Sequence, residues 1–239
     1  MTDPLDQLRG KLTDADDRFD VENALAGANL IRELALQVHM SMRGEPGAWR
    51  RDWNLAAGSR LDGILEQSLR YAVNNMFSGK YFGCFTRSYF GDSLERYHAA
   101  KAAVESVRGL DALAEVLRKH FFDCRIDIPE SLRAVRVGDA EGTATKLLIL
   151  FQEILLNAVK YAAFTEQERR FVTIRMAERE RGFTFEVVNS ADGGAAVENP
   201  DGIGHIVIRN FAELFKAEHR AGLTADGTYE VKLDFSLDS

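Results

Sequence analysis

Apolar positions recur at intervals of three and four residues through most of the first 120 positions, which is the period of an amphipathic helix. They predict a first long helix over residues 17–42, ended by the segment GEPG, and a second over 57–77. Two shorter helices are expected over 91–107 and 109–120. The inward stripe of the second long helix is Leu61, Ile64, Leu65, Leu69 and Val73. One pair of such helices exposes more apolar surface than it covers, so we expect a bundle completed by further helices or by a second subunit, and hence a homodimer.

After residue 120 the pattern changes to the alternation typical of strands. It predicts strands in FFDCRIDIP and AVRVGD, a helix that holds QEILLNAVKYAA, and a strand pair over RRFVTIRMAE and GFTFEVVNS. A helix over 203–218 and a last strand pair ending in TYEVKLDFSL follow. This order predicts an α+β fold with helices on one face of a mixed sheet. We therefore expect a helical dimerisation region over residues 1–120 and a second domain over 121–239.

The segment KYFGCFTRSYFGD carries five aromatic residues between positions 81 and 90. Stacking on nucleic-acid bases would need basic partners, and only Lys80 and Arg87 are near. The segment therefore favours packing or an interface.

Composition narrows the classes of function. The net charge of -7 and the pI of about 5.4 argue against sequence-independent binding of nucleic acid, which needs a clustered positive surface. No apolar run approaches the roughly 20 residues that cross a bilayer, and the acidic start MTDPLDQL lacks the layout of a signal peptide, so we expect a cytoplasmic protein without a membrane span. The two cysteines, Cys84 and Cys124, have no metal-ligand spacing.

Three polar residues fall on successive turns of one side of the helix over QEILLNAVKYAA: Glu153, Asn157 and Lys160. A nucleotide with bound magnesium needs an oxygen ligand, which Asn157 offers, and positive charge near phosphate, which Lys160 offers. Glu153 is placed to orient or deprotonate a water or a hydroxyl group. The alternatives are an ion pair of Glu153 with Lys160 or Arg175, and a structural hydrogen bond for Asn157.

A glycine-rich stretch, GGAAVENPDGIGH, occupies residues 193–205, and its Gly202 and Gly204 stand at the start of a predicted helix. Free amide groups and the helix dipole favour an anion at such a start. Glycine spacing alone is a weak signal, because many such loops are only turns.

Together these residues resemble the ATP-binding domain of the GHKL superfamily, which includes sensor histidine kinases, gyrase and mismatch-repair ATPases. The resemblance covers about residues 121–239. The stretch from Glu153 to Tyr161 looks like the N box of the family, and GIGHIVIRN at 202–210 looks like its second glycine box, in which a leucine commonly stands in place of His205. Gly227-Thr228 resembles a further element before the last strand.

The resemblance implies ATP and Mg²⁺ as cofactors. It implies that Asn157 binds magnesium and that Lys160 and Tyr161 lie near the phosphates or the nucleotide. Gly202 and Gly204 would flank a flexible lid. Thr228 would belong to the nucleotide site.

One position departs from the family pattern. The family usually carries an aspartate at the end of the strand after the N box, where it accepts a hydrogen bond from the adenine amino group. The alternation of Phe183, Phe185 and Val187 places Asn189 there, whose oxygen still accepts but without a negative charge. Asp192, three residues later, is the alternative.

A histidine kinase also needs a phosphoryl-accepting histidine on a dimerising helix. Of the five histidines, His39 on the first long helix has a suitable distance in sequence from Asn157, although no acidic residue follows it directly. His98 is the second candidate, and a chain with no acceptor is the third possibility.

These features predict a two-component-type signalling protein that binds Mg-ATP and transfers a phosphoryl group to a histidine, with a response regulator or another signalling protein as partner. One alternative is a non-catalytic or ATP-free adaptor similar to a histidine phosphotransferase. The other is a serine kinase of the anti-sigma type, which shares an E-x-x-x-N helix.

Overall fold

The computed structural model describes residues 60–77, 87–91, 93–137, 143–191 and 203–236. Contacts between Cα atoms divide the chain into two compact units, Met1–Asn54 and Leu55–Ser239, and every described residue belongs to the second. The described helices are α4 (Leu61–Met76), α5 (Arg87–Phe90), α6 (Leu94–Ser106), α7 (Leu110–His120), α8 (Glu130–Arg133), α9 (Thr143–Ala162), the 3₁₀-helix η4 (Gln167–Arg169) and α10 (Ile203–Leu214). The described strands are β1 (Asp123–Asp127), β2 (Phe171–Arg179), β3 (Gly182–Ser190), β4 (Glu218–Leu223) and β5 (Thr228–Ser236).

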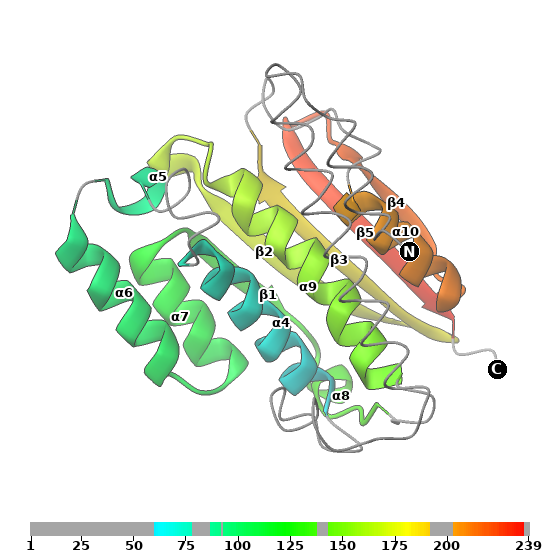
Figure 1. The fold of residues 1–239 in the computed structure, drawn as a ribbon. Helices are drawn as coiled ribbons and strands as arrows, with labels where there is room; N and C mark the ends of the chain where they lie inside the picture. Colours follow the sequence, from blue (N-terminus) through cyan, green and yellow to red (C-terminus); the bar gives the residue numbers. More distant parts are fainter. Residues whose placement is uncertain (1–59, 78–86, 92, 138–142, 192–202, 237–239) are drawn as a thin grey trace, which may run out of the picture. The chain divides into compact units, whose positions relative to one another are not determined.

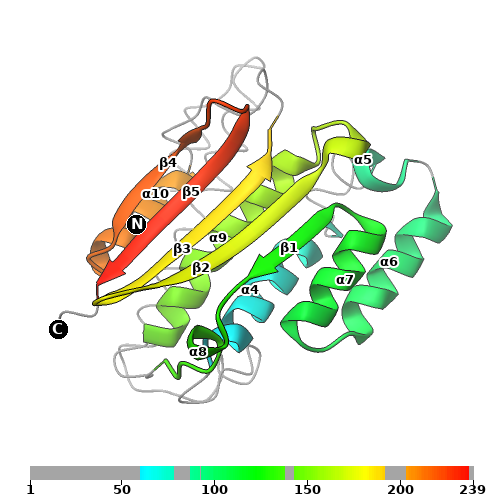
Figure 2. The same cartoon turned by 180° about the vertical axis from the view of Figure 1, so that it is seen from behind.

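The five strands form one sheet in the order β1-β2-β3-β5-β4 (Figure 2). β1 pairs parallel to β2, and the other neighbours are antiparallel, so the sheet is mixed as the sequence predicts. β2 and β3 form the predicted hairpin, whose strands meet at the pair Arg179 and Gly182. Gly182 has a φ of 147°, and a Cβ atom there would lie 1.9 Å from the Phe235 carbonyl oxygen. Only glycine fits this close approach to β5.

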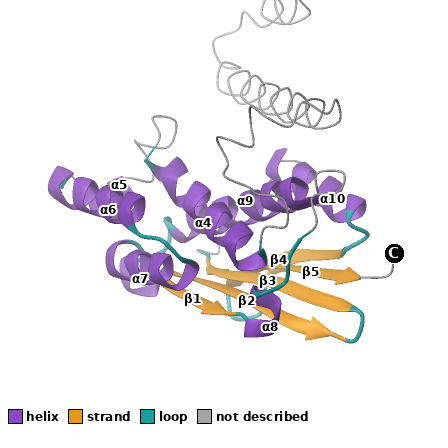
Figure 3. Cartoon of the chain, turned by 90° about the horizontal axis from the view of Figure 1, so that it is seen from below, coloured by secondary structure: helices purple, strands orange, loops and turns teal. Residues whose placement is uncertain are grey.

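The helices α4, α9 and α10 lie on one face of the sheet (Figure 3). Alternation along the strands sends the buried apolar side chains to that face: Val172, Ile174, Met176, Phe185, Val187, Val231, Leu233 and Phe235. Phe151 of α9 stacks on Phe185 of β3, with the ring centroids 4.2 Å apart and both side chains fully buried. The predicted α+β class, with helices on one face of a mixed sheet, is therefore confirmed.

The apolar stripe of α4 is buried as predicted, with Leu61, Ile64, Leu65, Leu69 and Val73 at most 1% exposed. Its partner is α9 rather than a neighbouring molecule, since Ser68 Oγ donates hydrogen bonds to Ile64 O at 2.8 Å and to Leu148 O of α9 at 3.3 Å. Figure 1 shows the two helices side by side on the sheet. Burial of five such side chains stabilises the unit by roughly 10 kcal/mol before conformational entropy is counted.

This packing bears on the expected domain organisation. The stripe of α4 is not left open for a second subunit, and α4, α6 and α7 belong to the same compact unit as the sheet. The division at residues 54 and 55 differs from the boundary near residue 120 that the change of pattern indicates. Residues 17–42 lie outside the described part of the chain, so a dimer built on the first helix stays a prediction.

Two local expectations have different outcomes. In the aromatic segment, Tyr89 and Phe90 are 3% exposed and pack edge-to-face on Phe121, with ring centroids 5.5 and 5.3 Å from it. The packing interpretation is confirmed for these two residues. The strand expected in AVRVGD is wrong for residues 134–137, where the only pairing is an isolated bridge between Arg136 and Arg60. The short helix α8 takes the preceding residues instead, and its end at Arg133 leaves too few residues for a strand.

Candidate functional site

The polar stripe of α9 lies on a helix that is otherwise almost wholly buried. Glu153 is 8% exposed, whereas Asn157, Lys160 and Tyr161 are half-buried. The Lys160 ammonium lies 5.3 Å from the centre of the Tyr161 ring, a cation–π distance. The Asn157 amide makes no hydrogen bond with any residue that the structure describes, and its partial exposure leaves both its oxygen and its nitrogen open to a ligand.

The first turn of α10 lies directly against this stripe. A Cβ atom on Gly204 would lie 3.1 Å from Asn157 Nδ2, 3.6 Å from Asn157 Oδ1 and 3.5 Å from Glu153 Oε2. Glu153, Asn157 and Gly204, which the sequence singles out separately, therefore meet at one point. The amide groups at the start of a helix are available to an anion, so Gly204 lets such donors come close to the Asn157 oxygen.

Gly204→Val is expected to weaken binding of Mg-ATP by at least about tenfold, because its branched side chain would push α10 away from Asn157. Gly222→Val is the matched control, since a Cβ atom on Gly222 has no neighbour within 4 Å among the described residues. Isothermal titration of both variants measures the difference. Equal affinities for ATP would show that the approach of α10 to Asn157 has no part in binding.

Asn189 ends β3 on the helix-covered face, where the sequence places it. Its side chain is 1% exposed, and Nδ2 donates to the Ser190 carbonyl at 2.9 Å, which leaves Oδ1 as the acceptor of the amide. In the sheet Asn189 lies between Val172 of β2 and Tyr229 of β5, and Ser190 pairs with Thr228. Asp192, the alternative, lies outside the described residues.

Thr228 is held by a local network at the β4–β5 turn. Its hydroxyl lies 2.8 Å from Thr224 Oγ1, and its amide donates to the same oxygen at 3.2 Å. The next residue, Tyr229, interacts with Tyr161 of α9, and burial and this neighbour raise the pKa of its phenol. Burial likewise raises the pKa of Tyr161. The two rings thus connect α9 to the end of β3 and the start of β5.

Positive groups gather where α9 and α10 meet. Burial lowers the pKa of His205, and Arg209 and Lys160 lower it further. Burial also lowers the pKa of His219, assisted by His205 and Arg209. Both imidazoles are therefore neutral at pH 7, and Lys160 and Arg209 carry the charge. Mutual repulsion among these groups is relieved when an anion binds beside them.

A clamp at the end of α9 was not anticipated from the sequence. Arg170 donates from Nε to the Thr165 carbonyl at 2.8 Å, from Nη1 to the Ser88 carbonyl at 2.9 Å and from Nη2 to Ser88 Oγ at 2.9 Å. Ser88 Oγ in turn donates to the Ala163 carbonyl. Tyr89 lies under the guanidinium at 4.9 Å and donates to the Val159 carbonyl at 3.0 Å. These contacts fix the last turn of α9, which carries Lys160 and Tyr161.

The structure thus brings together Glu153, Asn157 and Gly204 at one point, with Lys160 and Tyr161 further along α9 and Asn189 and Thr228 on the adjoining strand ends. Gly202 and His39 lie outside the described residues. Tyr229, Arg209 and the Arg170 clamp were missed. Alternating burial along TYEVKLDFSL predicts that strand but gives no sign that Tyr229 meets a helix.

Two searches of the described residues complete the account. None of their helices has the length and hydropathy of a membrane span. They also contain no group of three or more histidine, cysteine, aspartate or glutamate side chains able to hold a metal ion.

Solved structures of histidine kinases are similar to this chain. A histidine kinase domain from the blue-light activated histidine kinase of Erythrobacter litoralis has 14% identity and a TM-score of 0.41, over 72% of this chain and 92% of that one. The cytoplasmic segment of histidine kinase QseC has 16% identity and a TM-score of 0.43, over 89% and 93%. The Acinetobacter baumannii histidine kinase AdeS has 14% identity and a TM-score of 0.40, over 74% and 94%.

No protein-family model matches the sequence, and no curated protein matches it. The identities and TM-scores of the similar structures are low, so no argument about function rests on them. The function has to be argued from the residues of this chain.

Proposed function

We propose that this chain binds Mg-ATP between α9 and α10 and transfers a phosphoryl group to a histidine, as a signalling kinase of the histidine kinase type. The observation that carries the proposal is the approach of Gly204 to Asn157 and Glu153, at 3.1 and 3.5 Å from a Cβ position. It unites an amide oxygen, a carboxylate and the start of a helix, which are the groups that a magnesium-bound triphosphate and its acceptor require.

Each residue has a distinct role in this proposal. Asn157 supplies a neutral oxygen to the metal, Lys160 supplies charge to the phosphates, and the first turn of α10 supplies backbone amides. The Asn189 oxygen accepts from an amino group of the base. Bound Mg-ATP supplies the phosphoryl group. The residues fit this ligand, because the Asn157 amide has no hydrogen bond within the described part of the chain and the cations face one another without an anion between them.

Incubation with γ-labelled ATP and magnesium tests the proposal. We expect label on the protein that is lost in acid and retained in base, which identifies phosphohistidine. Label that resists acid would indicate a serine kinase. Measurable binding of ATP without label would favour the adaptor.

Glu153→Gln is expected to leave the affinity for Mg-ATP within about threefold and to reduce phosphoryl transfer by roughly 100-fold. A residue that orients or deprotonates the acceptor acts mainly in the transition state, and glutamine keeps its size but loses its basicity. Titration calorimetry measures the first quantity and label incorporation the second. If both fall together, Glu153 has a structural role in the pocket.

His39→Gln is expected to abolish the acid-labile label, because His39 is the candidate acceptor on the first predicted helix. His98→Gln, on the described helix α6, is the matched control and should keep the label. Label that survives His39→Gln and disappears in His98→Gln would transfer the assignment to His98.

The non-catalytic adaptor stays the second candidate because of Asn189. Its amide carries no negative charge, and its Nδ2 is already used by the Ser190 carbonyl. Adenine would therefore be held more weakly than by a carboxylate.

A further inference from the structure

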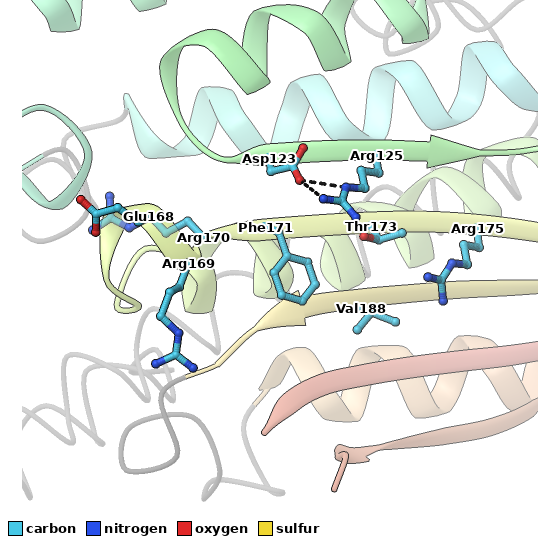
Figure 4. A pocket seen from close by; sticks show the side chains of 9 residues that line it. All are labelled: Asp123, Arg125, Glu168, Arg169, Arg170, Phe171, Thr173, Arg175 and Val188. Carbon is cyan, nitrogen blue, oxygen red and sulfur yellow. Dashed lines mark hydrogen bonds and ion pairs between the residues drawn. The ribbon is translucent and has the colours of Figure 1, made fainter. Parts of the chain in front are cut away.

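A second hollow lies far from the α9–α10 site in kind and in position. It has a volume of about 470 Å³ and is formed by β1, η4, β2 and β3 (Figure 4). Its lining includes Arg125, Arg169, Phe171, Thr173, Arg175 and Val188. Four arginines and two acidic residues line it in total, so it is a basic region on a chain whose net charge is -7.

The hollow is on the face of the sheet opposite to α9. Along β2, Val172, Ile174 and Met176 are buried under the helices, so the intervening Phe171, Thr173 and Arg175 point to the other face. Along β3 the same alternation separates Val188 from Asn189. The sheet therefore stands between this hollow and the α9–α10 site, and the two sites have no residue in common.

The arginines of the hollow differ in how far their donors are used. Arg170 is consumed by its clamp on Ser88 and Thr165. Arg125 engages one oxygen of Asp123 through Nε, at 2.8 Å, and Nη2. Arg175 engages Glu186 only through Nη1, at 3.0 Å.

These pairs leave donors available. Arg125 and Arg175 each keep free N–H groups on the other side of the guanidinium, and their side chains are 70% and 53% exposed. The guanidinium of Arg169 makes no ion pair with a residue that the structure describes, and the residue is exposed. Three arginines from β1, η4 and β2 can thus accept new carboxylate partners without breaking an existing pair.

An apolar floor separates these cations. Phe171 and Val188 are half-buried and belong to the lining, and Phe171 lies between Arg169 and Arg175 in Figure 4. Residues two apart on a strand are about 6.8 Å apart, which is also the repeat of side chains on one side of an extended peptide. Such a peptide matches the hollow when it places an apolar side chain on Phe171 and carboxylates on either side.

We propose that this hollow binds an extended acidic segment of a partner protein, with carboxylates on Arg169 and on Arg125 or Arg175 and an apolar side chain on Phe171 and Val188. The exposed arginines favour a segment lying across the surface over a small ligand, which a site encloses by most of its area. The acidic Asp123, Glu168 and Glu186 disfavour the continuous negative charge of nucleic acid. The proposal is independent of ATP binding.

Fluorescence anisotropy with the labelled heptapeptide Glu-Glu-Leu-Glu-Glu-Glu-Glu and the full-length protein tests this inference. We expect saturable binding that Arg169→Glu weakens at least tenfold and that Arg125→Gln weakens several-fold. Arg220→Glu is the matched control, because Arg220 is an exposed arginine on β4 of the same sheet, and it should bind as the parent does. Thermal melts establish that each variant is folded.

Two further comparisons decide the source of binding. The peptide with glutamine in place of every glutamate should not bind, and Asn157→Ala should bind the acidic peptide unchanged. Absence of binding, an unchanged affinity in Arg169→Glu, or equal binding of the glutamine peptide would overturn the proposal. Tighter binding of single-stranded DNA of the same charge than of the acidic peptide would also overturn it.

Discussion

Asn157→Ala is expected to weaken binding of ATP in the presence of magnesium by about 100-fold, since loss of one metal ligand is felt by the whole metal-bridged triphosphate. Asn157 makes no hydrogen bond with another described residue, so its removal leaves no buried partner unsatisfied. The melting temperature without nucleotide should therefore stay within about 1 °C. The two quantities separate a ligand from a structural amide.

The measurement is a calorimetric titration with and without magnesium, together with thermal melts of the same samples. Asn74→Ala is the matched control, because Asn74 is an exposed asparagine on helix α4 and away from the site. We expect the loss of affinity in Asn157→Ala to be largest with magnesium present. An unchanged affinity accompanied by a lower melting temperature would remove Asn157 from the proposed metal site.

Arg170→Ala is expected to lower the free energy of unfolding by about 3 kcal/mol. The substitution removes three hydrogen bonds from a charged donor and leaves the carbonyls of Thr165 and Ser88 without them. Binding of ATP should fall as well, because the clamp fixes the turn that carries Lys160 and Tyr161. Arg170→Lys is expected to recover little of the stability, since an ammonium cannot donate in three fixed directions.

Urea denaturation followed by circular dichroism measures this effect. Arg169→Ala, at the neighbouring exposed arginine, is the control and should change the free energy of unfolding by less than about 0.5 kcal/mol. If Arg170→Ala is as stable as Arg169→Ala, the clamp contributes nothing to the fold. If stability falls but the affinity for ATP is kept, the last turn of α9 does not depend on it.

Much of the fold follows from local patterns in the sequence. The period of two in RRFVTIRMAE and GFTFEVVNS predicts the β2–β3 hairpin, and the same alternation places Asn189 at the end of β3. The period of helix α9 places Glu153, Asn157 and Lys160 on one side. These features depend only on residues that are close in sequence, so their prediction needs no knowledge of the tertiary structure.

What the sequence could not predict depends on contacts between distant residues. An amphipathic stripe on α4 shows that one face is buried but not that α9 covers it, so an open dimer face and a boundary near residue 120 seemed to follow. The Arg170 clamp joins residues 82 positions apart, and nothing near either end marks it. Gly204 illustrates the same limit, because its closeness to Asn157 appears only after α10 has packed on α9.

The packing of α4 on α9 determines how the unit comes apart. A chain cut at residue 121 would keep every strand but would expose to water the side of α9 that α4 covers, including the region of Leu148. Helix and sheet residues are therefore expected to melt in a single cooperative transition, without an intermediate in which only the strands persist. The smallest fragment of this chain with independent stability consequently begins before α4, well ahead of the first strand.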